Sequence, residues 1–109
     1  MGKFEIYRAK NNDYFFRLKA MNGQIILASE GYKAKNSCNN GIQSVKRNSI
    51  NLDMYARKIA KNGQHYFVLK SINGEIIGKS EFYSTKAGLE NGIFSVKHNA
   101  PSADVFDLT

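Results

Sequence analysis

The chain has 109 residues and carries 16 Lys and Arg against nine Asp and Glu, for a formal net charge of +7. One proline, one cysteine and no long apolar run exclude a Pro-rich linker, an internal disulfide, a multi-cysteine metal site and a membrane-spanning helix. The first residues lack the apolar stretch of a secretory signal, and together with the single cysteine this predicts a cytoplasmic protein without a membrane partner.

Three strands are predicted near the start of the chain. Residues 4–9 are rich in aromatic and β-branched side chains, as strands are. Residues 14–20 alternate between two faces, which is typical of an antiparallel strand that is buried on one side only. One face of this strand holds Phe16 and Leu18, and the other holds Phe15, Arg17 and Lys19. The Asn-Gly pair at 22–23 predicts a hairpin into a third strand at residues 24–30, because both residues accept positive φ.

A helix follows, and then the whole pattern repeats with an offset of 51 residues. In the helix, Cys38, Ile42 and Val45 recur at i, i+4 and i+7 and form its apolar face. The segments Asn40-Gly41-Ile42-Gln43-Ser44-Val45-Lys46-Arg47-Asn48 and Asn91-Gly92-Ile93-Phe94-Ser95-Val96-Lys97-His98-Asn99 correspond, and about half of the positions in residues 14–48 are identical without a gap. Two copies are too few for a solenoid. We therefore expect one domain over residues 1–109 with internal pseudo-two-fold symmetry, made of repeat one (about 3–53) and repeat two (about 54–109).

The two predicted helices differ at their first turns. The second has its apolar side chains at Leu89, Ile93 and Val96. Ser84 or Thr85 can cap that helix, whereas Lys33 replaces Ser84 in repeat one, which predicts a poorer cap there.

Two further residue types recur in both helices. Glycine in a helix interior costs about 1 kcal/mol against alanine, so the repeated Gly41 and Gly92 predict a close approach of the helix backbone to the sheet. Asn48 and Asn99 can end the helices in the left-handed conformation.

The segment after each helix also corresponds between the repeats. Residues 53–55 lead into the first strand of repeat two, at residues 54–60, whereas residues 104–106 have no unit after them and are predicted to form a last strand in the part of the sheet that belongs to repeat one. The order is therefore βββα-βββα-β. The predicted core consists of Phe16, Leu18, Ile25, Ile42, Val45, Phe67, Leu69, Ile76, Ile93 and Val96. Because Ile25-Ile26-Leu27 is apolar throughout, the sequence leaves open which face Ile26 and Ile77 occupy.

The repeated motifs resemble a known family. Asn-Gly, Ser-Glu-x-Tyr and Asn-Gly-Ile-x-Ser-Val-Lys-x-Asn, each present twice, are similar to those of the YegP-like family of small bacterial and archaeal proteins, over residues 3–106. The resemblance implies an α+β fold in which tandem βββα repeats form one antiparallel sheet, two helices cover one face and the C-terminal strand is exchanged. It is a family of unknown function, so the resemblance implies no catalytic residues.

The residues do not favour an enzyme. Cys38 aligns with Leu89 and is expected to be a buried small hydrophobe rather than a nucleophile. His65 and His98 are not repeated, and two histidines alone make a poor metal site. Glu30 and Glu81 are repeated and face each other if the symmetry axis passes between them, but a local role at the helix starts is the preferred interpretation. We expect no catalytic residues, no metal and no cofactor.

Basic and aromatic residues gather on the predicted outward face of the sheet. Rings interleaved with cations on an open sheet are typical of proteins that stack single-stranded bases and track phosphates. The candidate ligand-binding residues are Phe15, Arg17, Lys19, Tyr66, Lys70 and Lys79. We expect a non-enzymatic binding module that binds single-stranded nucleic acid weakly and in a salt-sensitive manner.

The alternative partner is another protein. The same face carries Phe15, Tyr66 and Val68, and it gains Ile26 and Ile77 if these point outward, which would favour a protein-interaction or self-association module without nucleic acid. Exposed edge strands offer a second route to such binding. Because the duplication already supplies internal symmetry, a monomer is expected.

Overall fold

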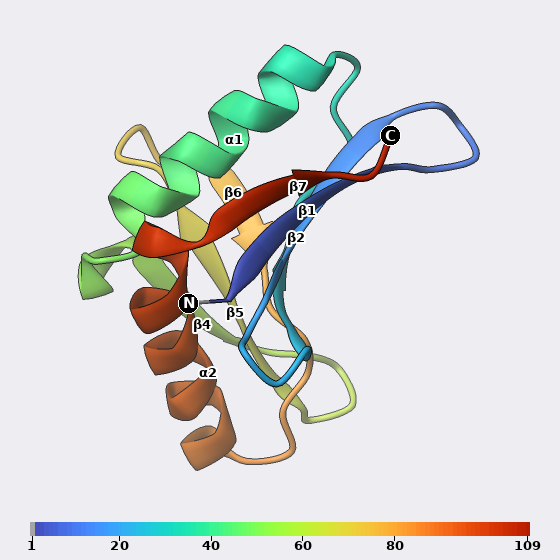
Figure 1. The fold of residues 1–109 in the computed structure, drawn as a ribbon. Coiled ribbons are helices and arrows are strands. Elements are labelled where there is room, and N and C mark those ends of the chain that lie inside the picture. Colours follow the sequence, from blue (N-terminus) through green and yellow to red (C-terminus); the bar gives the residue numbers. More distant parts are fainter. Residues whose placement is uncertain (1) are drawn as a thin grey trace.

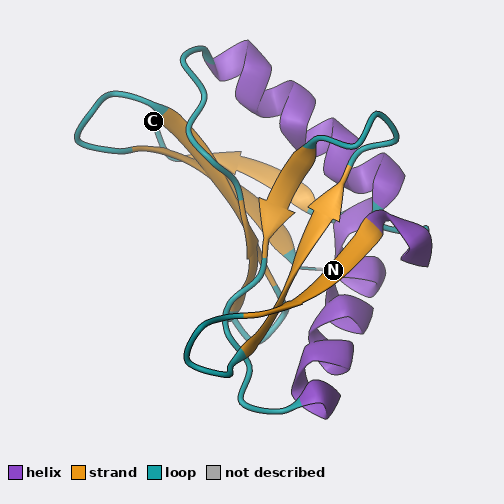
Figure 2. Ribbon diagram, turned by 180° about the vertical axis from the view of Figure 1, so that it is seen from behind, coloured by secondary structure: helices purple, strands orange, loops and turns teal. Residues whose placement is uncertain are grey.

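The computed structural model describes residues 2–109, in which seven strands form one sheet with both helices on the same side of it (Figure 2). The α+β architecture and the order βββα-βββα-β are confirmed. The elements are β1 (Lys3–Arg8), β2 (Tyr14–Lys19), β3 (Ile25–Ala28), α1 (Lys35–Asn48), the 3-10 helix η1 (Leu52–Met54), β4 (Tyr55–Ile59), β5 (His65–Lys70), β6 (Ile76–Lys79), α2 (Lys86–Asn99), the 3-10 helix η2 (Ala100–Ser102) and β7 (Asp104–Asp107). No helix within residues 2–109 combines the length and apolarity needed to cross a bilayer.

The sheet joins the two repeats at its centre and exchanges one strand at its edge. The strand order is β4-β5-β6-β3-β2-β1-β7, so β3 and β6 lie side by side at the pseudo-two-fold axis. The last strand, β7, crosses to repeat one and pairs with β1, as predicted (Figure 1). This pairing is parallel, because both strands start at the same end of the sheet, with Lys3 opposite Asp104. The expectation of a wholly antiparallel sheet is therefore wrong at this edge: the sheet is mixed, with antiparallel pairing everywhere else.

The core lies between the sheet and the two helices, and most of its predicted members are confirmed. The helix residues expected to face the sheet are all buried: Cys38, Ile42, Val45, Leu89, Ile93 and Val96. The strand residues Phe16, Leu18, Phe67 and Leu69 are fully buried as well. The alternation predicted for residues 14–20 is thus correct, and it leaves the opposite side of the sheet, the open face, to the polar and aromatic side chains.

The predicted places of Ile25 and Ile76 in the core are wrong. Ile76 is 50% exposed and Ile25 is half-buried, whereas their neighbours Ile26 and Ile77 belong to the core. The physical reason is a shift of register between Leu18 and Lys19 in repeat one, which is repeated between Leu69 and Lys70 in repeat two. Such a bulge places an extra residue on one strand and turns the side chains beyond it to the other face.

The repeated helix glycines make room for a tyrosine ring. A methyl group at Gly41 would lie 2.9 Å from Cζ of Tyr32, and one at Gly92 would lie 2.6 Å from Cζ of Tyr83. Both distances are shorter than side chains tolerate. A close approach at these glycines is therefore confirmed, but its main partner is the tyrosine of the Ser-Glu-x-Tyr motif, which follows β3 or β6, rather than a strand of the sheet.

The helix ends differ in part from expectation. Thr85 caps α2, its Oγ1 accepting a hydrogen bond from the Gly88 N–H at 3.0 Å, whereas Ala34 at the start of α1 offers no side-chain cap. The poorer first cap is thus confirmed. The left-handed ends predicted at Asn48 and Asn99 are wrong, since neither has a positive φ. After each helix, the backbone instead continues in the right-handed region. The asparagine Nδ2 donates a hydrogen bond to the serine carbonyl four residues earlier.

Candidate binding site on the open face of the sheet

One row of residues crosses the open face through all seven strands. Residues opposite one another in neighbouring strands share a face of the sheet, so the register defines this row. The row runs through the middle of the face, with Arg17 and Lys79 on either side of Ala28. From β7 to β4 it consists of Phe106, Glu5, Arg17, Ala28, Lys79, Val68 and Ala56.

In repeat one, three cations surround one carboxylate, and we call Lys3, Glu5, Arg17 and Lys19 the Glu5 cluster. Nε of Arg17 lies 2.8 Å from Oε1 of Glu5, Nζ of Lys19 lies 3.1 Å from the same oxygen, and Nζ of Lys3 lies 3.5 Å from Oε2. The Glu5 side chain is only 8% exposed. Hydrogen bonds from Arg17 and Lys19 outweigh its desolvation and lower the pKa of Glu5 to about 2. The cluster keeps a net charge of +2.

Two aromatic rings adjoin the Glu5 cluster. Tyr7 and Phe15 stand opposite each other on β1 and β2, with ring centroids 5.6 Å apart and planes 17° from parallel. The guanidinium carbon of Arg17 lies 4.6 Å from the centroid of the Tyr7 ring. Repeat one therefore presents stacked rings beside held cations, an arrangement that suits an anionic ligand with a planar group.

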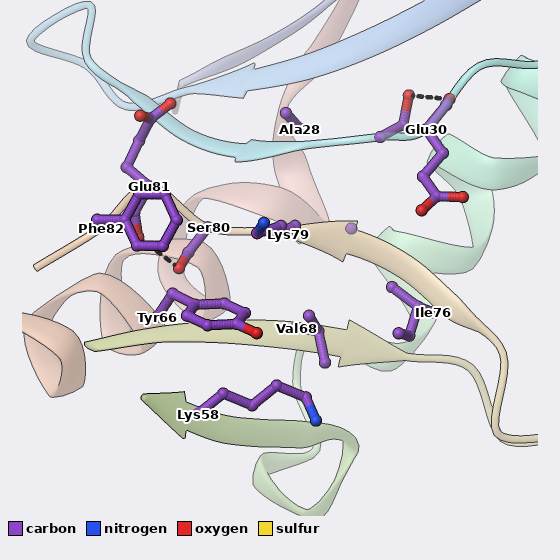
Figure 3. Close-up of a pocket in the computed structure, with 12 residues that line it drawn as sticks. Ala28, Glu30, Lys58, Tyr66, Val68, Ile76, Lys79, Ser80, Glu81 and Phe82 are labelled. Atoms are coloured by element: carbon purple, nitrogen blue, oxygen red, sulfur yellow. Dashed lines mark hydrogen bonds between the residues drawn. The ribbon is translucent and has the colours of Figure 1, made fainter. Parts of the chain in front are cut away.

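In repeat two, the open face forms a hollow of about 430 Å³ (Figure 3). Val68, which is only 3% exposed, lies in the middle of this hollow, and Lys58 extends along one side of it. The Tyr66 and Phe82 rings lie together at one end, 5.5 Å apart and nearly edge to face. Nζ of Lys79 lies 4.9 Å from the Tyr66 centroid and 5.3 Å from that of Phe82.

The predicted site residues form two groups rather than one. Phe15, Arg17 and Lys19 lie together in repeat one, and Tyr66 lies with Lys79 in repeat two. Lys70 occupies the open face at the end of β5, and no ion pair joins it to a residue within 2–109.

Several residues of the site were not found from the sequence. The alternation of faces along the strands predicted at residues 4–9 and 54–60 was the signal that could have placed Glu5, Tyr7 and Lys58 on the open face. Phe82 carried no such signal, because it follows β6 in a segment without periodicity.

The preferred local role of the repeated glutamates at the helix starts is wrong. Thr85 rather than Glu81 caps α2, and Glu30 does not cap α1. Both glutamates are exposed and border the hollow instead, on different sides of it (Figure 3).

Cys38 lies in the hydrophobic core on the sheet-facing side of α1. It is fully buried, as expected, and burial raises the pKa of its thiol to about 11. Within residues 2–109, no three His, Cys, Asp or Glu side chains come close enough together to hold a metal ion.

Comparison with known proteins gives the chain its relatives. A family model described as "Domain of unknown function (DUF1508)" matches residues 9–55 and 60–107, one match for each repeat. The UPF0339 protein ACIAD0721 of Acinetobacter baylyi is 51% identical over 108 residues, which is 99% of this chain and 97% of that protein. The UPF0339 protein YegP of Escherichia coli is 46% identical over 99% of this chain and 98% of its own length.

Two solved structures share the fold. The solution NMR structure of UPF0339 protein SO3888 from Shewanella oneidensis superposes with a TM-score of 0.94 at 44% identity, over 99% of this chain and 92% of that one. The solution NMR structure of the E. coli protein yegP gives the same TM-score at 46% identity, over 99% and 93%. The architecture is thus common to all three chains.

Proposed function

Since this chain belongs to the family of DUF1508 domains, whose name carries no activity, we propose its function from geometry: the open face of the sheet binds single-stranded nucleic acid without catalysis. The single observation that carries the proposal is the cross-strand row. It sets Arg17 and Lys79 in the middle of the face, two strand spacings or about 10 Å apart, with only the methyl group of Ala28 between them. A single strand of nucleic acid that lies along this row can place its phosphates beside both Arg17 and Lys79.

Aromatic rings flank this row in both repeats. Tyr7 and Phe15 stack in repeat one, and Tyr66 and Phe82 pack together at the end of the hollow in repeat two. Phe82 is 48% exposed, so a base can reach its ring. Base–aromatic stacking is tolerant of sequence, and cations on the same face supply the electrostatic attraction that such binding needs. This arrangement supports binding without base-specific contacts.

The alternative, an apolar face for a protein partner, has less support. Ile26 and Ile77 lie in the core rather than on the open face, and Val68 is nearly inaccessible at the bottom of the hollow. Around the hollow, the half-exposed Ile76 is the one large aliphatic side chain among the rings, lysines, serines and glutamates of residues 2–109 that line it. Large exposed apolar patches mark protein-binding sites, whereas the apolar surface of this hollow is small and interrupted by charged side chains.

Fluorescence anisotropy with labelled single-stranded RNA and DNA, at low and physiological salt, tests the proposal. We expect micromolar binding that weakens steeply with salt. Tyr66→Ala is expected to cost about 1–3 kcal/mol of binding free energy, because it removes a stacking ring. Phe94→Ala is the matched control, since Phe94 is an exposed ring on α2, away from the open face.

The lysine at the centre of the face needs its own comparison. Lys79→Ala should weaken binding more than Lys97→Ala, which removes the same charge from the last turn of α2. If Tyr66→Ala binds as tightly as the unmodified protein, the attraction is that of a basic protein for any polyanion. Absence of binding at low salt would overturn the proposal and leave a protein partner as the remaining hypothesis.

A further inference from the structure

The Glu5 cluster contains more cationic charge than its carboxylate balances. Glu5 contacts all three cations, yet one carboxylate neutralises only one of them. The cations are 24–45% exposed, whereas Glu5 is 8% exposed and lies beneath them. Like charges held this close repel one another, so the arrangement is favourable for a second anion on the solvent side.

Arg17 is held at two points, and these contacts set its direction. Its Nε donates to Glu5 at 2.8 Å, and its guanidinium lies over the Tyr7 ring. Neither of its Nη groups donates a hydrogen bond within residues 2–109. A guanidinium fixed at Nε and on one face presents its remaining N–H groups as a rigid fork, which matches the spacing of two phosphate oxygens.

We propose that Lys3, Arg17 and Lys19 form a phosphate-binding site, in which Glu5 and Tyr7 are positioning residues. The ligand group is a phosphoryl group, either a terminal phosphate or a phosphodiester of a nucleic-acid backbone. The site deepens the proposed function and rests on it for the source of the phosphate.

The carboxylate of Glu5 orients the cations without using up their donors. It accepts one N–H of Arg17 at 2.8 Å and lies within ion-pair distance of the two lysine ammonium groups, each of which has three N–H donors. Because hydrogen bonds from Arg17 and Lys19 lower the pKa of Glu5 to about 2, the carboxylate is ionised near pH 7, where a phosphate is charged as well. A net charge of +2 then matches a phosphate monoester, which carries about −1.5 to −2 near pH 7.

Repeat two lacks the site, although the backbone there is the same. At the positions of Glu5, Arg17 and Lys19 it has Ala56, Val68 and Lys70. Without the carboxylate and the guanidinium, Lys70 stands alone. We therefore expect one phosphate site of this kind per chain, confined to β1 and β2.

An NMR titration with inorganic phosphate, near pH 7 and at low salt, tests this site. The expected result is a saturable shift of the Arg17 Nε–Hε signal and of the β1 and β2 amides, with no comparable shift at Lys70. Arg17→Lys keeps the charge but loses the fork, and it should weaken binding about tenfold. Arg47→Lys is the matched control, an arginine in the last turn of α1 whose replacement should change nothing.

A second variant tests the Tyr7 ring, over which the Arg17 guanidinium lies. Tyr7→Leu removes no charge, so weaker phosphate binding by this variant would show that the orientation of Arg17 matters. The proposal is overturned if phosphate produces no saturable shift at Arg17, or if Arg17→Lys and Arg47→Lys bind phosphate equally well.

Oligonucleotides then separate this proposal from the proposed function. Tighter binding of a 5′-phosphorylated oligonucleotide than of its 5′-hydroxyl form identifies a terminal phosphate, whereas equal binding that Arg17→Lys weakens in both identifies the backbone. If phosphate shifts Arg17 but Tyr66→Ala leaves oligonucleotide binding unchanged, the phosphate site stands and the stacking surface fails. If oligonucleotides bind and Arg17→Lys has no effect, the stacking surface stands and the phosphate site is wrong.

Discussion

Glu5 is the residue that distinguishes the two halves of the open face. Ala56 takes its position in repeat two. The residue opposite differs as well, since Val68 stands in repeat two where repeat one has Arg17. Repeat one therefore has a charged network where repeat two has a hollow. The duplicated backbone thus presents two different surfaces, one suited to phosphate and one suited to a planar group.

The Glu5 network also predicts an acid-sensitive contribution to stability. The pKa of Glu5 is lowered from 4.5 to about 2 in the folded chain, so its stabilising effect is present above about pH 4.5 and is lost as the pH falls toward 2. Glu5→Gln should destabilise the protein at pH 7 by on the order of 2 kcal/mol and should lose less stability in acid than the unmodified protein. Urea unfolding at several pH values between 7 and 2.5 measures both curves.

Glu30→Gln is the control for this prediction, because Glu30 is exposed and makes no ion pair within residues 2–109. Its curve should run parallel to that of the unmodified protein. If the free energy of unfolding of Glu5→Gln also runs parallel to that of the unmodified protein as the pH falls, the charge of the buried carboxylate contributes nothing to stability.

Prediction of individual site residues succeeded where the alternation along one strand determines which face a side chain occupies. It failed where the contact depends on which residues of two strands stand opposite each other. Phe15, Arg17 and Lys19 follow from the pattern of a single strand. That Arg17 bonds Glu5 depends on which residues of β1 and β2 stand opposite each other, and one strand alone does not contain that information. The pairing of Phe82 with Tyr66 depends on the path of an irregular segment.

At the scale of elements, the duplication predicted strands, helices and their order, and the errors lie at backbone irregularities. Ile25-Ile26-Leu27 offers no alternation, so the sequence alone could not place the bulge that sends Ile26 into the core. The Ser-Glu-x-Tyr motif is explained only by contacts between elements. Oγ of Ser29 accepts from the Phe16 N–H at 2.9 Å and donates to the Glu30 carbonyl at 2.9 Å, which fixes the end of β3 against β2.

The unequal helix caps predict a simple way to stabilise the protein. Ala34 occupies the N-cap position of α1 with φ −123° and ψ 145°, close to the −130° and 156° of Thr85 on α2. Ala34→Thr should therefore add a cap and raise the free energy of unfolding by about 0.5–2 kcal/mol, and Thr85→Ala should lower it by a similar amount. Thermal or urea unfolding checks both signs. A destabilising Ala34→Thr would show that the start of α1 cannot accept the hydroxyl.

At the scale of the whole molecule, the exchanged strand makes the two edges of the sheet unequal. β7 covers the outer side of β1, and there Ile6 is only 1% exposed. No strand within residues 2–109 covers β4, and the position equivalent to Ile6 is Arg57. Arg57 bonds Glu90 of α2 through two contacts of 2.6 and 2.9 Å, and charges of this kind at an open edge prevent strand pairing between molecules.

Removing this ion pair is therefore expected to make the molecule self-associate. The double variant Arg57→Ile with Glu90→Asn copies Ile6 and Asn39, the residues that repeat one has at the same positions. It leaves an apolar side chain on an uncovered edge, because no strand within residues 2–109 pairs with the outer side of β4. Sedimentation velocity over a tenfold to hundredfold range of concentration should show a monomer for the unmodified protein and a dimer or larger species for the double variant. Arg57→Lys, which keeps a charge at the edge, should remain monomeric. If the double variant stays monomeric at every concentration, the β4 edge is protected by its backbone and not by the Arg57–Glu90 pair.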